Sequence, residues 1–84
     1  GLLLLCTDVP GVQGEGRVLD RLDATAAETM LADGSASAGM RPKLRAALVA
    51  AAAGCEVRIV DGRSPSALES ALHGRSGGTL VTAA

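Results

Sequence analysis

The sequence predicts an α/β fold, a partial three-layer sandwich in which helices pack on a mostly parallel sheet. Two observations support this prediction. Short apolar runs typical of strands alternate with longer stretches of helical spacing, and Gly, Pro, Asp and Ser residues separate them. The chain has 84 residues, 48% of them hydrophobic, which suits one small domain and excludes a disordered chain.

The first quarter of the chain is expected to form a strand, a turn and a hairpin-like loop. Residues 2–6, LLLLC, are a short continuous apolar run, which is typical of a fully buried strand in a parallel sheet. TDVPG (7–11) then forms a strand-end turn. Two glycines in VQGEGR (12–17) predict a hairpin-like loop, and VLDRL (18–22) a brief extended segment.

Two helices follow. Asp23 or Thr25 can cap a helix over 24–33, which Gly34 ends, and SASAG (35–39) forms a flexible loop. Pro42 favours the first turn of a second helix, which extends to about residue 53. The apolar positions of this helix recur at helical spacing: Leu44, Ala47, Leu48 and Ala51.

The last third of the chain predicts a strand, a helix and a strand. VRIV (57–60) is a second buried strand, and DGR (61–63) forms the turn after it, with Asp61 and Arg63 read as a structural pair. Ser64 caps a helix that extends to about His73, and GGTLV (77–81) forms the closing strand. Ligand sites of such sheets lie beyond the carboxyl ends of the strands.

Composition excludes several kinds of function. The net charge is −1 and the chain has no aromatic residue, which argues against a nucleic-acid or anionic-membrane surface. Leu2 to Leu5 is too short an apolar run to cross a membrane, so we expect a cytoplasmic protein. Cys6 and Cys55 are expected to be buried free thiols in a reducing compartment, with a disulfide between them as the alternative.

A cluster of cations stands where the second helix begins. Arg41, Lys43 and Arg45 occupy its first turns, although cations are favoured at the opposite end of a helix. A helix N-terminus binds anions, phosphate above all, and the small residues of 35–39 let a ligand approach the backbone. The pattern therefore indicates a phosphate site; the alternative is three solvated charges. Asp8, at the end of the first strand, is equally well explained as a functional residue or as a cap.

Five stretches of the chain form a series: TDVPGV (7–12), AGMRPKLRAAL (38–48), VRIVDGR (57–63), SAL (66–68) and GGTLV (77–81). In order and approximate spacing, this series resembles the acetylglutamate kinase family of the amino-acid kinase superfamily. The resemblance covers nearly the whole chain but only the C-terminal, nucleotide-binding half of that fold. It implies that residues 1–84 are a portion of one kinase domain, and the start at Gly1 likewise leads us to expect a fragment.

The resemblance also implies a role for particular residues. Lys43 matches the lysine that contacts the transferring phosphoryl group of ATP, with Mg²⁺ bridging the phosphates. Two segments match those that line the nucleotide: Asp8, Val9, Pro10, Gly11, Val12 and Gln13 in the first, and Ser35, Ala36 and Ser37 in the second. The chain departs from the family at Ser35 and Ala38, where apolar residues and a glycine are usual, and at Arg41, which replaces an aliphatic residue.

The implied reaction is phosphorylation of the side-chain carboxylate of N-acetyl-L-glutamate, a step in arginine biosynthesis, by an enzyme that forms a homo-oligomer when complete. The residues that bind this substrate have no counterpart in the chain, so we expect the 84 residues alone to be inactive. Two alternatives stay open. One is the carrier-protein-linked aminoadipate or glutamate kinase of lysine biosynthesis, and the other is a non-catalytic nucleotide-binding or structural fragment.

Overall fold

The computed structural model describes all residues from 1 to 84 and confirms the α/β class. The main sheet has the strand order β1-β5-β6-β4, formed by Leu2–Thr7, Glu56–Asp61, Thr79–Thr82 and Arg21–Asp23 respectively. β1 pairs with β5 and β4 pairs with β6 in parallel, whereas β5 and β6 are antiparallel. The sheet is therefore mixed but mostly parallel.

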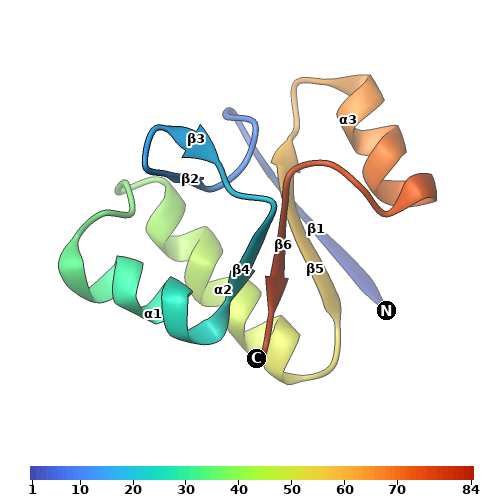
Figure 1. Ribbon diagram of the computed structural model, residues 1–84. Helices are drawn as coiled ribbons and strands as arrows, with labels where there is room; N and C mark the ends of the chain where they lie inside the picture. Colours follow the sequence, from blue (N-terminus) through green and yellow to red (C-terminus); the bar gives the residue numbers. More distant parts are fainter.

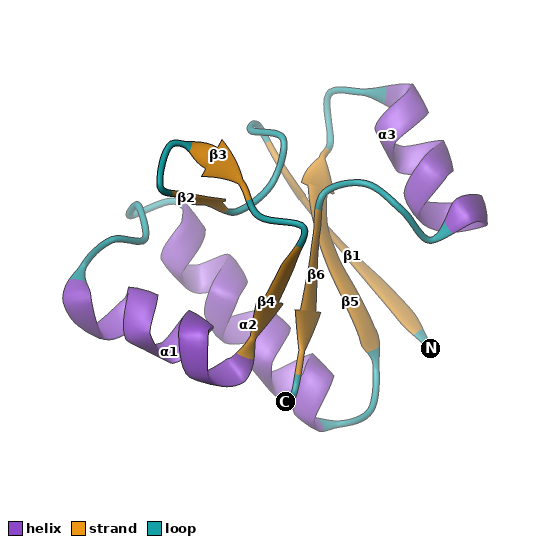
Figure 2. Cartoon of the chain, in the orientation of Figure 1, coloured by secondary structure: helices purple, strands orange, loops and turns teal.

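Helices cover both faces of this sheet, which gives the three predicted layers. Helices α1 (Ala24–Asp33) and α2 (Met40–Ala52) lie on one side, as Figure 1 and Figure 2 show. Helix α3 (Pro65–Glu69) lies on the other side and continues into a π-helical turn, Ser70–Gly74. None of these helices has the length and apolar character needed to cross a membrane.

Local capping interactions set the helix ends where the sequence predicts them. The Asp23 carboxylate accepts a hydrogen bond from the Ala26 N–H at 2.8 Å, and Gly34 closes α1 with a left-handed φ of 79°. At the start of α3, the Ser64 hydroxyl accepts a hydrogen bond from the Ala67 N–H at 3.2 Å. These bonds satisfy N–H groups that have no partner within the helix.

Helix α2 supplies most of the core contacts between the helical layer and the sheet. Leu44 and Ala47 are fully buried, and Ala51 is nearly so, which confirms the predicted apolar face. They pack in one cluster with Val57 and Val81 of the central strands. The helix begins at Met40, so Pro42 lies in its first turn as predicted. The Ser37 carbonyl of the preceding loop accepts hydrogen bonds from the N–H groups of Met40 and Arg41.

The predicted hairpin-like loop is a small antiparallel ribbon. β2 (Gln13–Gly14) pairs with β3 (Arg17–Val18) across a two-residue turn. Glu15 and Gly16 have φ values of 55° and 79°, as the tight turns of short hairpins require. The ribbon projects from the sheet beside the loop that connects α1 to α2 (Figure 1).

Two burial predictions are wrong, one for the first strand and one for the two cysteines. Leu2 to Leu5 are all partly exposed rather than fully buried, because β1 is an edge strand with β5 as its only neighbour in the sheet. Cys6 is exposed and Cys55 half-buried, although both thiols are free as expected. An apolar run predicts a strand, but it does not predict on how many sides the strand is covered.

The turn after β5 confirms the structural pairing of Asp61 with Arg63. The Asp61 carboxylate accepts hydrogen bonds from Arg63 Nε at 3.0 Å and Nη2 at 3.1 Å, and from the Arg63 backbone N–H at 2.9 Å. The side-chain hydrogen bonds with Arg63 lower the pKa of Asp61 below its usual range, and they raise the pKa of Arg63. The pair fixes the backbone where β5 leaves the sheet.

Acidification is expected to destabilise the fold. Asp33, Glu56 and Asp61 all have folded-state pKa values below their usual 3.8, 4.5 and 3.8, chiefly because each accepts hydrogen bonds. A lowered carboxyl pKa contributes stability that is present above the usual pKa and lost as the pH falls through the folded-state pKa. The urea midpoint should therefore be flat from neutral pH to about 5 and fall at lower pH. A midpoint unchanged down to about pH 3 would contradict this expectation.

Candidate functional site

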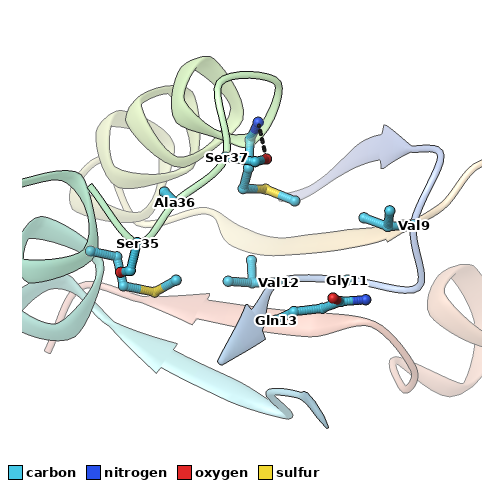
Figure 3. Close-up of a pocket in the computed structure, with 9 residues that line it drawn as sticks. Val9, Gly11, Val12, Gln13, Ser35, Ala36 and Ser37 are labelled. Carbon is cyan, nitrogen blue, oxygen red and sulfur yellow. Dashed lines mark hydrogen bonds between the residues drawn. The ribbon is translucent and has the colours of Figure 1, made fainter. Parts of the chain in front are cut away.

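A cavity of about 260 Å³ opens between the segment that follows β1 and the loop that joins α1 to α2 (Figure 3). Its position beyond the carboxyl end of β1 is the one expected for a ligand site in this class of fold. Five of its lining residues are apolar: Val9, Val12, Met30, Ala36 and Met40. The others are Gly11, Gln13, Ser35 and Ser37.

The structure brings together most of the residues that the sequence singled out. Seven of them line this one cavity: Val9, Gly11, Val12, Gln13, Ser35, Ala36 and Ser37. Asp8 and Pro10 are exposed and do not line it, nor does Lys43. Met30 and Met40 also form the wall, although sequence reasoning did not single them out; the position of Met40 three residues before Lys43 was the available signal.

Hydrogen bonds fix the shape of the loop on one side of the cavity. The Ser35 N–H donates to the Asp33 carboxylate at 2.8 Å, and the Ala36 N–H donates to the Met30 carbonyl at 3.3 Å. Hydrogen bonds with Ser35 lower the pKa of Asp33, which keeps its carboxylate ionised. Ala36 is buried although it lies in a loop. The wall is thus a defined surface rather than the flexible loop that its composition suggested.

The first backbone N–H groups of α2 already donate hydrogen bonds within the protein. The Ser37 carbonyl accepts hydrogen bonds from the N–H groups of Met40 at 3.1 Å and Arg41 at 3.0 Å, and the Ser37 hydroxyl also accepts from Met40 at 3.2 Å. The N–H groups of Ser37, Ala38 and Gly39 in the preceding loop donate to no protein acceptor. An anion at this end of the helix would therefore meet loop N–H groups rather than a full first turn.

The three cations at this helix start have different surroundings. Arg41 donates from Nη1 to the Leu31 carbonyl at 2.9 Å, so its charge stabilises the C-terminal end of α1. Lys43 is half-buried, and its Nζ lies 3.5 Å from the Gly39 carbonyl oxygen. Arg45 is exposed, and its side chain makes no hydrogen bond. Lys43 and Arg45 are therefore not bound to a distant backbone group, and Lys43 is the nearer of the two to the start of the helix.

A buried threonine anchors the other wall of the cavity. The Val12 N–H donates to Thr79 Oγ1 at 2.9 Å, and the Thr79 hydroxyl donates to the Leu19 carbonyl at 2.6 Å. A Cβ at Gly11 would lie 2.9 Å from the same hydroxyl, so this position leaves no room for a side chain. Thr79 thus ties the last strand to the cavity wall over a sequence separation of 67 residues.

Replacing Thr79 with valine is expected to lower the free energy of unfolding by roughly 2–3 kcal/mol, because the buried Val12 N–H and the part-buried Leu19 carbonyl lose their partner. Thr82→Val is the matched control on the same strand, since the Thr82 hydroxyl bonds only to the exposed Ala84 carbonyl. Urea denaturation of both variants measures the difference. Equal losses in the two variants would show that the Thr79 hydroxyl does not anchor the wall.

The geometry suits a ligand with a flat apolar part and an anionic part. The apolar walls can hold a ring, and the loop N–H groups and Lys43 lie at the adjoining helix start. No group of three or more His, Cys, Asp or Glu side chains is arranged to hold a metal ion.

Comparison with known proteins identifies relatives of this chain. Residues 1–61 match the profile of the amino acid kinase family. The acetylglutamate kinase of Dehalococcoides mccartyi is 46% identical over 81 residues, which are 95% of this chain. Those of Rubrobacter xylanophilus and Gluconobacter oxydans are 44% and 43% identical, each over 96% of this chain. The chain spans 30%, 32% and 28% of the lengths of these three relatives.

Proposed function

Because the chain belongs to the amino acid kinase family, we propose that it forms the ATP-binding part of an acetylglutamate kinase. In the complete enzyme, the side-chain carboxylate of N-acetyl-L-glutamate attacks the γ-phosphorus of ATP. The bond from that phosphorus to the bridging oxygen breaks, giving an acyl phosphate and ADP. This reaction belongs to arginine biosynthesis, and we propose a cytoplasmic, homo-oligomeric enzyme.

The observation that carries the proposal is the meeting of residues 9–13 and 35–37 at one apolar cavity. The two segments lie more than twenty residues apart in the sequence. The volume of about 260 Å³ is slightly below the ~300–1,000 Å³ of complete small-molecule sites, so the cavity suits the base of a nucleotide better than all of it. Met30 and Met40 give its wall a soft surface for an aromatic ring.

In this proposal the phosphates extend from the cavity toward the start of α2. Lys43 and the free N–H groups of Ala38 and Gly39 would contact them there. Phosphoryl transfer spreads negative charge over the equatorial oxygens, so a fixed cation at that point stabilises the transition state. Bound Mg²⁺ would supply further neutralisation of the phosphate charge.

The acceptor site is proposed to lie in the remainder of the enzyme, since the chain spans only 30% of the D. mccartyi relative. The chain by itself is therefore expected to bind nucleotide and to show no turnover. A phosphorylated product formed by the purified 84-residue chain would contradict the proposal that the acceptor site lies outside this chain.

An amide NMR titration of the chain with Mg²⁺-ADP tests the binding half of the proposal. We expect saturable shifts in residues 9–13 and 35–43 and little elsewhere. Ser35→Phe should weaken binding strongly, because the exposed Ser35 side chain lies at the cavity and the new ring would fill it. Ser66→Phe, at an exposed serine of α3, is the matched control. A dispersed spectrum in which nothing shifts saturably would refute the nucleotide site.

A chimera tests the catalytic half. The chain would replace the matching 30% of the D. mccartyi acetylglutamate kinase, and the purified chimera would be assayed for ATP-dependent phosphorylation of N-acetyl-L-glutamate. Turnover above that of a truncated relative lacking the segment is expected. A chimera that binds both substrates but does not turn over would refute the proposed function.

A further inference from the structure

A row of side chains crosses the main sheet on the face opposite α1 and α2. Arg58 of β5 pairs with Leu80 of β6, and Leu80 pairs with Arg21 of β4. Paired residues on neighbouring strands point to the same face of a sheet. The adjacent row, in which Val57 pairs with Val81, is buried in the core beneath α2, so the arginine row points toward the layer of α3.

Helix α3 leaves part of this face open. A second cavity of about 270 Å³ lies here, between the start of β4, the side chain of Arg58 and the linker of residues 75–78 that leads into β6. Of its eight lining residues only Leu80 is apolar, so this cavity differs in kind from the apolar one beside α2.

Two of the arginines are held in place by one carboxylate. Arg58, whose side chain is only 13% exposed, donates from Nε to Glu56 at 3.4 Å and from Nη1 to the Gly77 carbonyl at 3.2 Å. Arg75 donates from Nη1 to the other oxygen of Glu56 at 2.8 Å. The hydrogen bond from Arg75 is the main reason that the pKa of Glu56 is lowered. One carboxylate thus orients two guanidinium groups and neutralises one of their charges.

The cavity contains hydrogen-bond donors without an acceptor, and its net charge is positive. The side chain of Arg21 makes no hydrogen bond, and the N–H groups of Gly77 and Gly78 donate to no acceptor. Three arginines face two carboxylates, Glu56 and Asp20, which leaves one net positive charge in a chain whose total charge is −1. Guanidinium groups fixed in this way can form paired hydrogen bonds to a planar carboxylate or to a phosphate.

We propose that the cavity bounded by Arg21, Arg58 and Arg75 is an anion site that binds the carboxylate or phosphate group of a small ligand. Arg58 and Arg75 are oriented before the ligand arrives, and Arg21 completes the ring of donors from the neighbouring strand. The inference does not depend on the kinase proposal, because it uses the other face of the sheet and none of the residues of the apolar cavity.

NMR titrations of the isotope-labelled chain with inorganic phosphate and, separately, with citrate test this site at constant ionic strength set with chloride. We expect saturable shifts of the Nε–H signals of Arg21, Arg58 and Arg75 and of the Gly77 and Gly78 amides. Saturation by phosphate alone would assign a phosphate ligand, and saturation by citrate alone a carboxylate ligand; either supports the site. Shifts that stay linear with both anions, or that occur only in residues 9–13 and 35–43, would overturn it.

Two variants that remove the same charge distinguish specific anion binding in this cavity from non-specific electrostatic attraction. Arg21→Gln should weaken anion binding about tenfold, the usual effect of losing one charged hydrogen bond. Arg17→Gln removes the same charge from an exposed position on β3 and should change the affinity less than about twofold. An equal loss in the two variants would overturn the site. A well-dispersed spectrum that neither anion perturbs would also overturn the site. That result is expected if this face binds an acidic segment of a protein instead of a small anion.

Discussion

Gly78→Ala is expected to unfold the chain or to lower its free energy of unfolding by about 3 kcal/mol or more. The residue has a φ of 62°, and an added Cβ would overlap the Ile59 carbonyl oxygen of the neighbouring strand. It would also lie 2.8 Å from a methyl carbon of Val60. Ile59 and Thr79 are paired in the sheet, so β6 cannot move away without losing its hydrogen bonds to β5.

Gly77→Ala is the matched control for this substitution. Gly77 also has a left-handed φ, of 84°, but no atom lies within 4 Å of an added Cβ. It should cost only the roughly 1–2 kcal/mol of a non-glycine residue in that conformation. Urea denaturation followed by circular dichroism measures both. Two variants of equal stability would show that the contact with β5 is not what requires glycine.

Lys43→Ala, made in the chimera described above, is expected to lower kcat about 10²- to 10³-fold with a small effect on the KM for ATP. The larger effect on kcat than on KM follows from the proposed role of Lys43. A cation that contacts the transferring phosphoryl group stabilises the transition state, in which negative charge is redistributed, more than it stabilises bound ATP. Lys43 is half-buried at the first turn of α2, with its Nζ near the Gly39 carbonyl.

Arg45→Ala provides the control, because Arg45 has the same charge on the next exposed position of the same helix. It should leave kcat within about twofold of the parent. If Lys43→Ala raised the KM for ATP and left kcat unchanged, Lys43 would be a nucleotide-binding residue without a role in the transition state. If the two variants lost activity equally, the effect would be one of net charge alone.

The helices could be predicted from the sequence because their signals are local. Asp23 and Ser64 accept hydrogen bonds three residues ahead, and Gly34 closes α1, all within one turn of the helix they limit. The hairpin at Glu15 and Gly16 is equally local. Each of these elements lies within two residues of its predicted place.

What the sequence could not predict depends on neighbours that are distant along the chain. The apolar run at Leu2 to Leu5 predicts a strand, but only the sheet order shows that this strand lies at an edge. The antiparallel pairing of β5 with β6 depends on how the linker of residues 75–78 turns. Thr79 carries no local signal, because its two partners are 60 and 67 residues away.

The cavity residues were grouped through family resemblance rather than through any pattern of composition. Nothing in the spacing of residues 9–13 and 35–37 brings them together; the packing of α1 and α2 against the sheet does so. The second cavity follows from strand register, which places Arg58 and Arg21 on one face. A one-residue shift of register would turn both side chains toward the core.

The position of β6 in the sheet makes two parts of the fold depend on one strand. β6 lies between β5 and β4, and β4 pairs with no other strand of the main sheet. β6 also carries Thr79, whose hydroxyl accepts the hydrogen bond from the Val12 N–H at the cavity wall. Detachment of β6 from β5 would therefore separate β4 from the sheet and release the cavity wall in the same event.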